Sequence, residues 1–521
     1  MTFCEFVNSA TCQTRFSPLP HLCAFDSSPV CVRDGGAISH CISGWYPLTS
    51  FSMKIAFMHF HLKTGGVTTV IRQQVEALLG TCETIALAGQ KPEGGFPCKV
   101  LPVSGIGYDS EAKKQPSPDK TAEAVIQAIR SCWKGGCDIL HVHNGTLAKN
   151  QNYLAILKRL QEKGVRLFLQ AHDFAEDGRP QAYFEEEYVP DCHYGVVNSR
   201  DYHILRRSGL KREGLHLIGN MVTPLPAQAK KPVPGGPVLY PIRAIRRKNI
   251  GEAILLSLFF PEGRPLYITL PPNSPADFPA YESWKRFAHQ HGLSVVFEAG
   301  LKHDFVELVH TADSLLTTSI NEGFGFSFME PWTAGKFLWG RDIEGITEDF
   351  KQSGLNLDHL YSRIRISLEW IRADRFFRSW QHAVNRAFQG FQISPEDLPL
   401  REACERLTTG GTVDFGLLDE TFQQQVVQTI IGSEERKADM INLNPFLADC
   451  GRYPNVAETI NANREVVTGC YSRTAYRSTL SVLYKKILSS DPVHAIDKRR
   501  LLKEFFNRDD FSLLKWGQYA S

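Results

Sequence analysis

A cluster of basic side chains in the second half of the chain could bind a phosphorylated substrate. It lies between a predicted strand (238–242) and a predicted helix (250–260), and it contains Arg243, Arg246, Arg247 and Lys248. Arginine offers a planar fork of donors that fits phosphate oxygens, whereas lysine acts as a point charge. A solvated surface loop and a clamp for a diphosphate are both compatible with this composition.

A pair of carboxylates follows in the stretch 321–335, which reads N-E-G-F-G-F-S-F-M-E-P-W-T-A-G. Seven residues separate Glu322 from Glu330, so the two groups are too far apart to share one proton. They could instead hold the two ends of an elongated ligand.

The glycines of the same stretch suggest a tight turn. A buried strand is predicted over 313–319 and a helix over 326–334, with Gly323 and Gly325 between them. Glycine lets the backbone turn sharply and approach a ligand closely, and the N–H groups at a helix start can bind a phosphate. The alternative is a hydrophobic strand–helix junction whose acidic residues are incidental.

A second glycine turn occurs near the start of the first predicted α/β region. Gly65 and Gly66 lie between a predicted strand (54–60) and a predicted helix (67–79). In an open α/β sheet, ligands bind at such turns, beyond the carboxyl ends of the strands. The pattern is not G-x-G-x-x-G, so it does not indicate a dinucleotide site.

Histidines at the ends of predicted strands point to the same crevice. His172 and Asp173 follow the strand 166–171, and His172 could be a general base, a donor to a sugar hydroxyl or a structural histidine. His141 and His143 share one face of the strand before it, but no acidic or cysteine partner for a metal ion is evident.

Strands and helices alternate through 53–345, which predicts an α/β fold with two parallel sheets. A stretch dense in Pro and Gly at 224–237 suggests a linker, which divides a first domain (53–232) from a second (233–345). Residues 346–521 look mainly helical, including a long pattern over 357–388, and we expect them to pack on the two-domain core. Residues 1–52 show no sustained period, so we expect a disordered extension upstream of Met53, which itself could be the true start.

Composition excludes several classes of protein. With 521 residues the chain exceeds a single core, and a net charge of +2 argues against an extended nucleic-acid surface. No run is long enough for a transmembrane helix, and no cysteine spacing matches a zinc site. The thirteen cysteines are expected to be reduced thiols of a cytoplasmic protein.

Taken together, the motifs resemble those of the retaining family 4 glycosyltransferases, which have the GT-B fold. Glu322 and Glu330 match the family's E-x7-E motif, and Arg243 and Lys248 match its R-x4-K motif, in the same order. The resemblance covers about 53–345. Asn249 stands where the family usually has glycine, which puts the identity of the donor in question rather than the fold.

The resemblance implies a role for each motif residue. Arg243 and Lys248 would stabilise the leaving diphosphate, Glu322 would contact the transferred sugar, and Glu330 would bind the nucleotide ribose. His172 would contact the sugar or orient the acceptor. The further donor- and acceptor-side residues are Gly65, Gly66, Asp173 and Gly323, together with Gly325, Phe326 and Ser327, whose backbone N–H groups would meet the phosphates.

The resemblance therefore predicts an enzyme that moves a hexose from a UDP-, GDP- or ADP-sugar to a hydroxyl acceptor without a metal or other cofactor. Two alternatives stay open: a nucleotide-sugar epimerase or hydrolase of the same fold, and a non-catalytic nucleotide-sugar-binding protein. The helical C-terminal region could complete the core, shape an acceptor pocket or form a homodimer.

Overall fold

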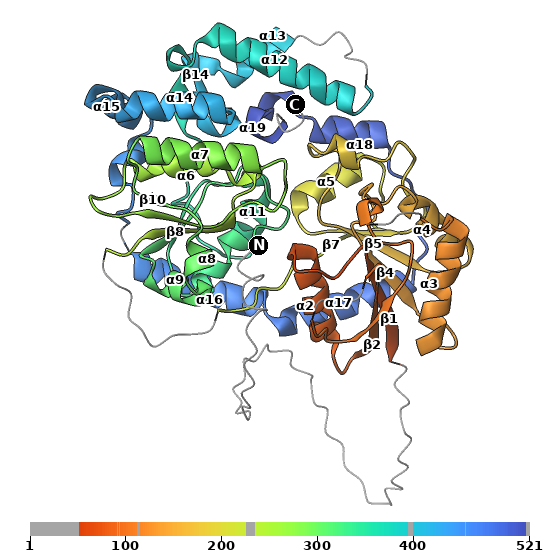
Figure 1. Cartoon of the computed structure of the whole chain (residues 1–521). Coiled ribbons are helices and arrows are strands. Elements are labelled where there is room, and N and C mark those ends of the chain that lie inside the picture. Colours follow the sequence, from red (N-terminus) through yellow and green to blue (C-terminus); the bar gives the residue numbers. More distant parts are fainter. Residues whose placement is uncertain are drawn as a thin grey trace, which may run out of the picture.

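The computed structural model describes residues 52–90, 92, 94–111, 115–225, 235–393, 400–453 and 455–516. Two parallel sheets stand side by side, each flanked by helices, and a helical layer from the C-terminal region lies over the helices on one face of the second sheet (Figure 1). The predicted extension lies outside the described residues except for Ser52, and so does most of the predicted linker. No helix within the described ranges is long and apolar enough to cross a membrane.

The first sheet has seven parallel strands in the order β3-β2-β1-β4-β5-β6-β7. Most of their residues are buried on both faces, because helices cover the sheet from both sides. The order reverses between β1 and β4, where a crevice opens at the carboxyl ends of the strands. The strands are β1 (Met53–His59), β2 (Cys82–Ala88), β3 (Lys99–Pro102), β4 (Ile139–His143), β5 (Leu167–Ala171), β6 (His193–Val196) and β7 (Leu215–Leu217), and the helices are α2 (Gly66–Leu78), α3 (Pro118–Cys132), α4 (Tyr153–Glu162) and α5 (Ser199–Arg207).

The second sheet has five parallel strands in the order β10-β9-β8-β11-β12, and its order reverses between β8 and β11. The turns that follow these two neighbouring strands therefore lie side by side. They carry the basic cluster and Glu322. The strands are β8 (Val238–Arg243), β9 (Leu266–Leu270), β10 (Val295–Val296), β11 (Ser314–Thr317) and β12 (Leu338–Gly340), and the helices are α6 (Ile250–Ser257), α7 (Phe278–Gln290), α8 (Ala299–Lys302) and α9 (Phe305–Thr311).

The two facing parallel sheets are the GT-B architecture that the sequence predicted. One prediction within the central motif is wrong: the stretch 326–334 is not one helix. It forms a 3-10 turn, η4 (Phe326–Phe328), and then a separate short helix, α10 (Glu330–Thr333). Glu330 is consequently the first residue of α10, whereas the sequence placed it more than a turn inside a helix.

The C-terminal region is largely helical, as expected, but the pattern over 357–388 is not a single helix. It contains a short strand, β13 (Arg365–Ser367), which pairs antiparallel with β14 (Thr412–Asp414). The helices are α11 (Glu344–Gln352), α12 (Ala373–Gly390), α13 (Leu400–Leu407), α14 (Glu420–Ile431), α15 (Glu434–Leu443), α16 (Val456–Cys470), α17 (Arg473–Leu488), α18 (Lys498–Phe505) and α19 (Leu513–Trp516).

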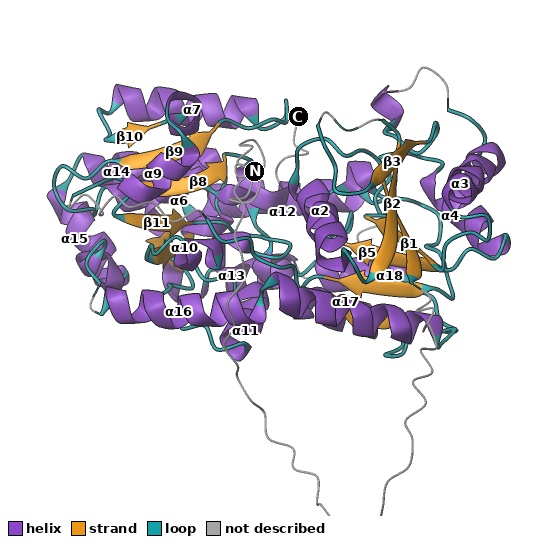
Figure 2. Ribbon diagram, turned by 90° about the horizontal axis from the view of Figure 1, so that it is seen from below, coloured by secondary structure: helices purple, strands orange, loops and turns teal. Residues whose placement is uncertain are grey.

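The end of the chain runs back and forth between the two sheets. Helix α16 packs against α10 on the second-sheet side, and α17 continues from it beneath the first sheet, where it packs against α2 (Figure 2). Apolar residues of α17, including Leu480 and Ile487, are fully buried in the core on that face. Helix α18 packs against α5, and α19 returns to α12.

Candidate active site

A cavity of about 120 Å³ lies between the two sheets. Each sheet contributes residues beyond the carboxyl ends of its strands: after β1, β5, β6 and β7 in the first sheet, and after β8 and β11, where the order reverses, in the second. Ten of the predicted site residues line it: Gly66, His172, Asp173, Lys248, Glu322, Gly323, Gly325, Phe326, Ser327 and Glu330. Gly65 and Arg243 were also predicted, but they are not among the lining residues.

Lys248 and Glu322 form a buried ion pair at this cavity. Burial alone would raise the pKa of Glu322, but the cations of Lys248 and Arg247 outweigh it and hold this pKa below its usual range. The Glu322 carboxylate is therefore ionised. An anionic ligand entering the cavity meets Lys248 already desolvated and fixed in place.

The turn that carries Lys248 is fixed by the strands beneath it. It is a 3-10 turn, η3 (Arg246–Lys248), and the Lys248 carbonyl accepts hydrogen bonds from Tyr240 Oη at 2.6 Å and Thr318 Oγ1 at 3.1 Å. Tyr240 belongs to β8, and Thr318 directly follows β11. The two strands on either side of the reversal therefore hold the turn together.

Arg247 is a cavity residue that sequence reasoning did not single out from its basic neighbours. Its Nη1 atom is buried and has no hydrogen-bond partner among the described residues. The same holds for Asn220 Oδ1 and Ser327 Oγ, which line the same cavity. Buried polar atoms are nearly always paired in folded proteins, so these atoms offer hydrogen-bonding positions to water or to a polar ligand in the cavity.

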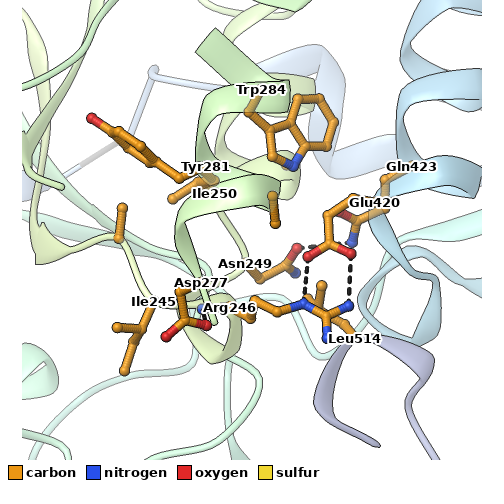
Figure 3. Close-up of a pocket in the computed structure, with 13 residues that line it drawn as sticks. Ile245, Arg246, Asn249, Ile250, Asp277, Tyr281, Trp284, Glu420, Gln423 and Leu514 are labelled. Carbon is orange, nitrogen blue, oxygen red and sulfur yellow. Dashed lines mark hydrogen bonds and ion pairs between the residues drawn. The ribbon is translucent and has the colours of Figure 1, made fainter. Parts of the chain in front are cut away.

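The other two cations of the cluster are bound elsewhere. Arg246 makes a two-pronged ion pair with Glu420 of α14, at 2.6 and 2.7 Å, and its backbone N–H donates to Asp277 (Figure 3). Arg243 ends β8 and donates from Nη1 to the Pro271 carbonyl at 3.1 Å. Arg246 thus anchors the turn to the C-terminal region, whereas Arg247 and Lys248 face the cavity.

Two positions in the acidic motif require glycine. Gly325 has φ +93°, a left-handed conformation that residues with side chains rarely adopt, and a Cβ there would lie 2.9 Å from Ile346 Cγ2. A Cβ on Gly323 would lie 2.9 Å from the His172 carbonyl oxygen. The motif backbone therefore approaches the first sheet as closely as packing allows.

Side chains at the start of α5 and in the loop after β5 also hold the motif. Asn198 donates from Nδ2 to the Gly323 carbonyl at 2.8 Å, and Arg200 donates from Nη1 to Asn321 Oδ1 at 3.0 Å. Asn321 in turn donates to Asp177 Oδ2 at 2.8 Å. The loop that carries Glu322 is consequently positioned by both halves of the molecule.

His172 and Asp173 form the first-sheet side of the cavity, as predicted. The His172 backbone N–H donates to Asn144 Oδ1 at 2.8 Å, and burial lowers the pKa of its imidazole to about 4, so the ring is neutral near pH 7. Burial would raise the pKa of Asp173, but Arg179, which donates to it at 2.8 Å, and Arg247 hold this pKa below its usual value.

The sequence is similar to that of a curated protein over most of its length. No protein-family model matches the sequence. The chain is 23% identical over 473 residues to mannosylglucosyl-3-phosphoglycerate synthase of Petrotoga mobilis, an alignment that covers 82% of this chain and 90% of that protein.

Solved structures of glycosyltransferases are also similar in part. A glycosyltransferase from Rickettsia africae has a TM-score of 0.48 at 12% identity, covering 85% of this chain and all (100%) of that one. The catalytic domain of starch synthase IV from Arabidopsis thaliana, bound to ADP and acarbose, has a TM-score of 0.46 at 12% identity, covering 84% of this chain and 100% of that one.

The fold assignment rests on the strand order of the two sheets, and the activity on the ordered basic and acidic motifs and on the alignment over most of the chain. The chain is a glycosyltransferase with the GT-B fold.

Proposed function

We propose that this glycosyltransferase transfers a hexose from a nucleotide-sugar donor to a hydroxyl acceptor with retention of the anomeric configuration. The observation that carries the proposal is the buried Lys248–Glu322 pair, which shares one cavity with Arg247 and lies where the strand order reverses. This arrangement places two fixed cations, Arg247 and Lys248, at the place where an open α/β sheet binds its ligands.

The chemistry requires such a site. Breaking the bond between a sugar and a diphosphate builds negative charge on the leaving group, and preorganised cations stabilise that charge without reorganising. We assign this role to Lys248 and Arg247, with the backbone at Phe326 and Ser327 contacting the phosphates. Glu322 then contacts hydroxyls of the transferred sugar, and Glu330 the ribose of the nucleotide.

The first-sheet side of the cavity would receive the acceptor. His172 and Asp173 lie there, opposite the cations of the second sheet, and Gly66 at the start of α2 lines the same space. The Petrotoga relative is named for the synthesis of mannosylglucosyl-3-phosphoglycerate, so phosphoglycerate glycosides are the first acceptors that we would test.

Binding of the donor is expected to raise the melting temperature of the full chain. A ligand that binds only the native state at about 100 times its Kd stabilises it by about 2.7 kcal/mol. We expect one of the UDP-, GDP- and ADP-sugars to produce this shift, without metal as well as with Mg²⁺, in differential scanning fluorimetry. Lys248→Ala should abolish the shift, whereas Lys302→Ala, an exposed lysine on α8, should retain it.

The product separates the possible reactions. NMR of the product should show the anomeric configuration of the donor, and inversion would contradict retention. Release of free sugar, or of an epimerised nucleotide-sugar in place of a glycoside, would support the same-fold hydrolase or epimerase. Absence of any shift with all three donor classes would favour either a non-catalytic role without nucleotide-sugar binding or a donor site that is completed only when acceptor or partner is present.

The two arginines of the basic cluster give a further prediction. Arg247→Ala should lower kcat/KM by about 10²-fold, because a buried donor to the developing phosphate charge is removed. Arg243→Ala should cost about tenfold or less, because its guanidinium is bound to the Pro271 carbonyl. Steady-state kinetics of both variants would measure the two losses of kcat/KM. A larger loss in Arg243→Ala would assign the contact with the leaving diphosphate to Arg243, the arginine of the R-x4-K motif.

A further inference from the structure

We propose that His143 is a positioning residue that fixes His172 in the tautomer with its proton on Nδ1, so that His172 offers a hydrogen-bond donor to the cavity and does not act as a base. The inference rests on the proposed function, because it specifies what one wall of that site presents to the substrate.

The two rings form a close pair across neighbouring strands. His143 ends β4, and His172 directly follows β5. His143 Nδ1 lies 2.8 Å from His172 Nε2, and the two rings lie edge to edge in nearly the same plane, with 5.1 Å between centroids and 11° between planes. His143 is fully buried, and His172 is nearly buried and lines the cavity. One proton must lie between the two nitrogens, donated by one ring or the other.

The surroundings of His143 decide which ring donates. Its second nitrogen, Nε2, is buried and has no hydrogen-bond partner among the described residues. If His172 donated, a neutral His143 would carry its proton on that Nε2 and bury an unpaired N–H group. If His143 donates from Nδ1, only a lone pair is left there. Orphaned buried N–H groups are the rarer case in folded proteins, so the second arrangement is favoured.

Protonation of His143 to the cationic form is disfavoured for the same reason. A cationic ring would also place an N–H at Nε2, and burial lowers the pKa of His143 well below its usual value, with His141 and His172 lowering it further. The stacked ring of His141, 4.4 Å away, cannot supply a partner either. Its Nε2 lies 2.9 Å from Gln170 Oε1, and its Nδ1 lies 2.9 Å from the hydroxyl of Tyr484 in α17.

The nitrogen of His172 that remains for the cavity is Nδ1, and in this tautomer it carries the proton. A neutral imidazole N–H matches an oxygen that accepts a hydrogen bond, such as a sugar hydroxyl or a phosphate oxygen. It cannot remove a proton from the acceptor, because the basic nitrogen of His172 is occupied by His143. Of the roles open for His172, the geometry therefore selects the donor.

Side-chain geometry supplies matched variants. The amide nitrogen of asparagine can take the position of Nδ1, whereas that of glutamine reaches further, toward the position of Nε2. We expect His172→Asn to retain a larger share of kcat/KM than His172→Gln. We also expect His143→Asn, which keeps the donor, to remain within about threefold of wild type, and His143→Leu to lose about tenfold. Equal losses in His143→Asn and His143→Leu would overturn the positioning role.

A spectroscopic readout is independent of turnover. In the wild-type full chain labelled with ¹⁵N-histidine, the resonances that disappear in His172→Asn belong to His172. Their ¹⁵N shifts should show a protonated Nδ1 and a bare Nε2, and the reverse pattern would refute the proposal. Absence of sugar transfer by the wild type would refute the proposed function instead, without changing the meaning of the tautomer.

Discussion

Replacement of Lys248 by alanine is expected to lower kcat/KM for sugar transfer by at least about 10²–10³-fold. Lys248 is buried beside the cavity, and its backbone carbonyl accepts hydrogen bonds from Tyr240 and Thr318. Its position at the cavity is therefore fixed. Its loss also leaves the Glu322 carboxylate facing the same space without its cation, which adds repulsion toward a diphosphate. Steady-state kinetics with the donor found by thermal shift would measure the effect.

A double variant separates catalysis from folding. Lys248→Ala alone should also lower the melting temperature, because removal of one partner leaves a buried charge uncompensated. In Lys248→Ala combined with Glu322→Gln, the melting temperature should recover in part while the rate stays low. Lys302→Ala provides the exposed-lysine control. Near wild-type turnover in the Lys248→Ala variant would remove this residue from the mechanism.

Replacement of Arg341 by alanine is expected to lower the free energy of unfolding by about 3–5 kcal/mol. Arg341 follows β12 and donates to both oxygens of Glu252, at 2.8 and 2.6 Å, and to both oxygens of Asp414, at 2.7 and 2.8 Å. Glu252 on α6 is fully buried. Without the guanidinium, two carboxylates would face each other inside the protein.

The free energy of unfolding that is lost in Arg341→Ala should increase with pH. Burial raises the pKa of Glu252, and Arg341 acts against that shift. In Arg341→Ala the pKa of Glu252 in the folded state should rise further above its unfolded value of about 4.3. At low pH the Glu252 carboxyl is protonated in both the folded and the unfolded state, so the substitution lowers stability little. At higher pH this carboxyl ionises more readily in the unfolded state than in the folded state, and the stability of the variant falls.

Thermal melts of wild type and Arg341→Ala would test this dependence. The difference in melting temperature should widen between about pH 5 and about pH 8. Arg159→Ala, which removes a partner of the exposed pair with Glu162, should melt like wild type at both values. A gap that narrows toward high pH would contradict the assignment of the buried carboxylates.

The location of the site followed from local sequence patterns. In parallel sheets the carboxyl ends of all strands lie at one edge, so polar residues after predicted strands, such as His172 and Glu322, were expected to lie close together. Both line the cavity. This part of the prediction needed only the alternation of strands and helices and the order of the motifs.

The roles within the basic cluster could not be read in the same way. Arg243, Arg246 and Arg247 are chemically alike in the sequence, and what separates them is distant: Glu420, which binds Arg246, is 174 residues away. The pairing of β13 with β14 is likewise non-local, and it overrode an apolar pattern that looked helical. Only the broken helix of the acidic motif had a local signal, since Pro331 lacks an N–H and favours the first turn of a new helix.

The path of the chain end makes each half of the enzyme discontinuous in sequence. The backbone passes from the first sheet to the second between β7 and β8, returns between α16 and α17, and passes over again between α18 and α19. A chimera that took its first-sheet half from a relative would therefore need three junctions, not one. It would also have to import α17, because Tyr484 of this helix hydrogen-bonds His141 of β4. Grafting 53–232 alone would therefore exchange the loops of the first sheet without the helix that supports it.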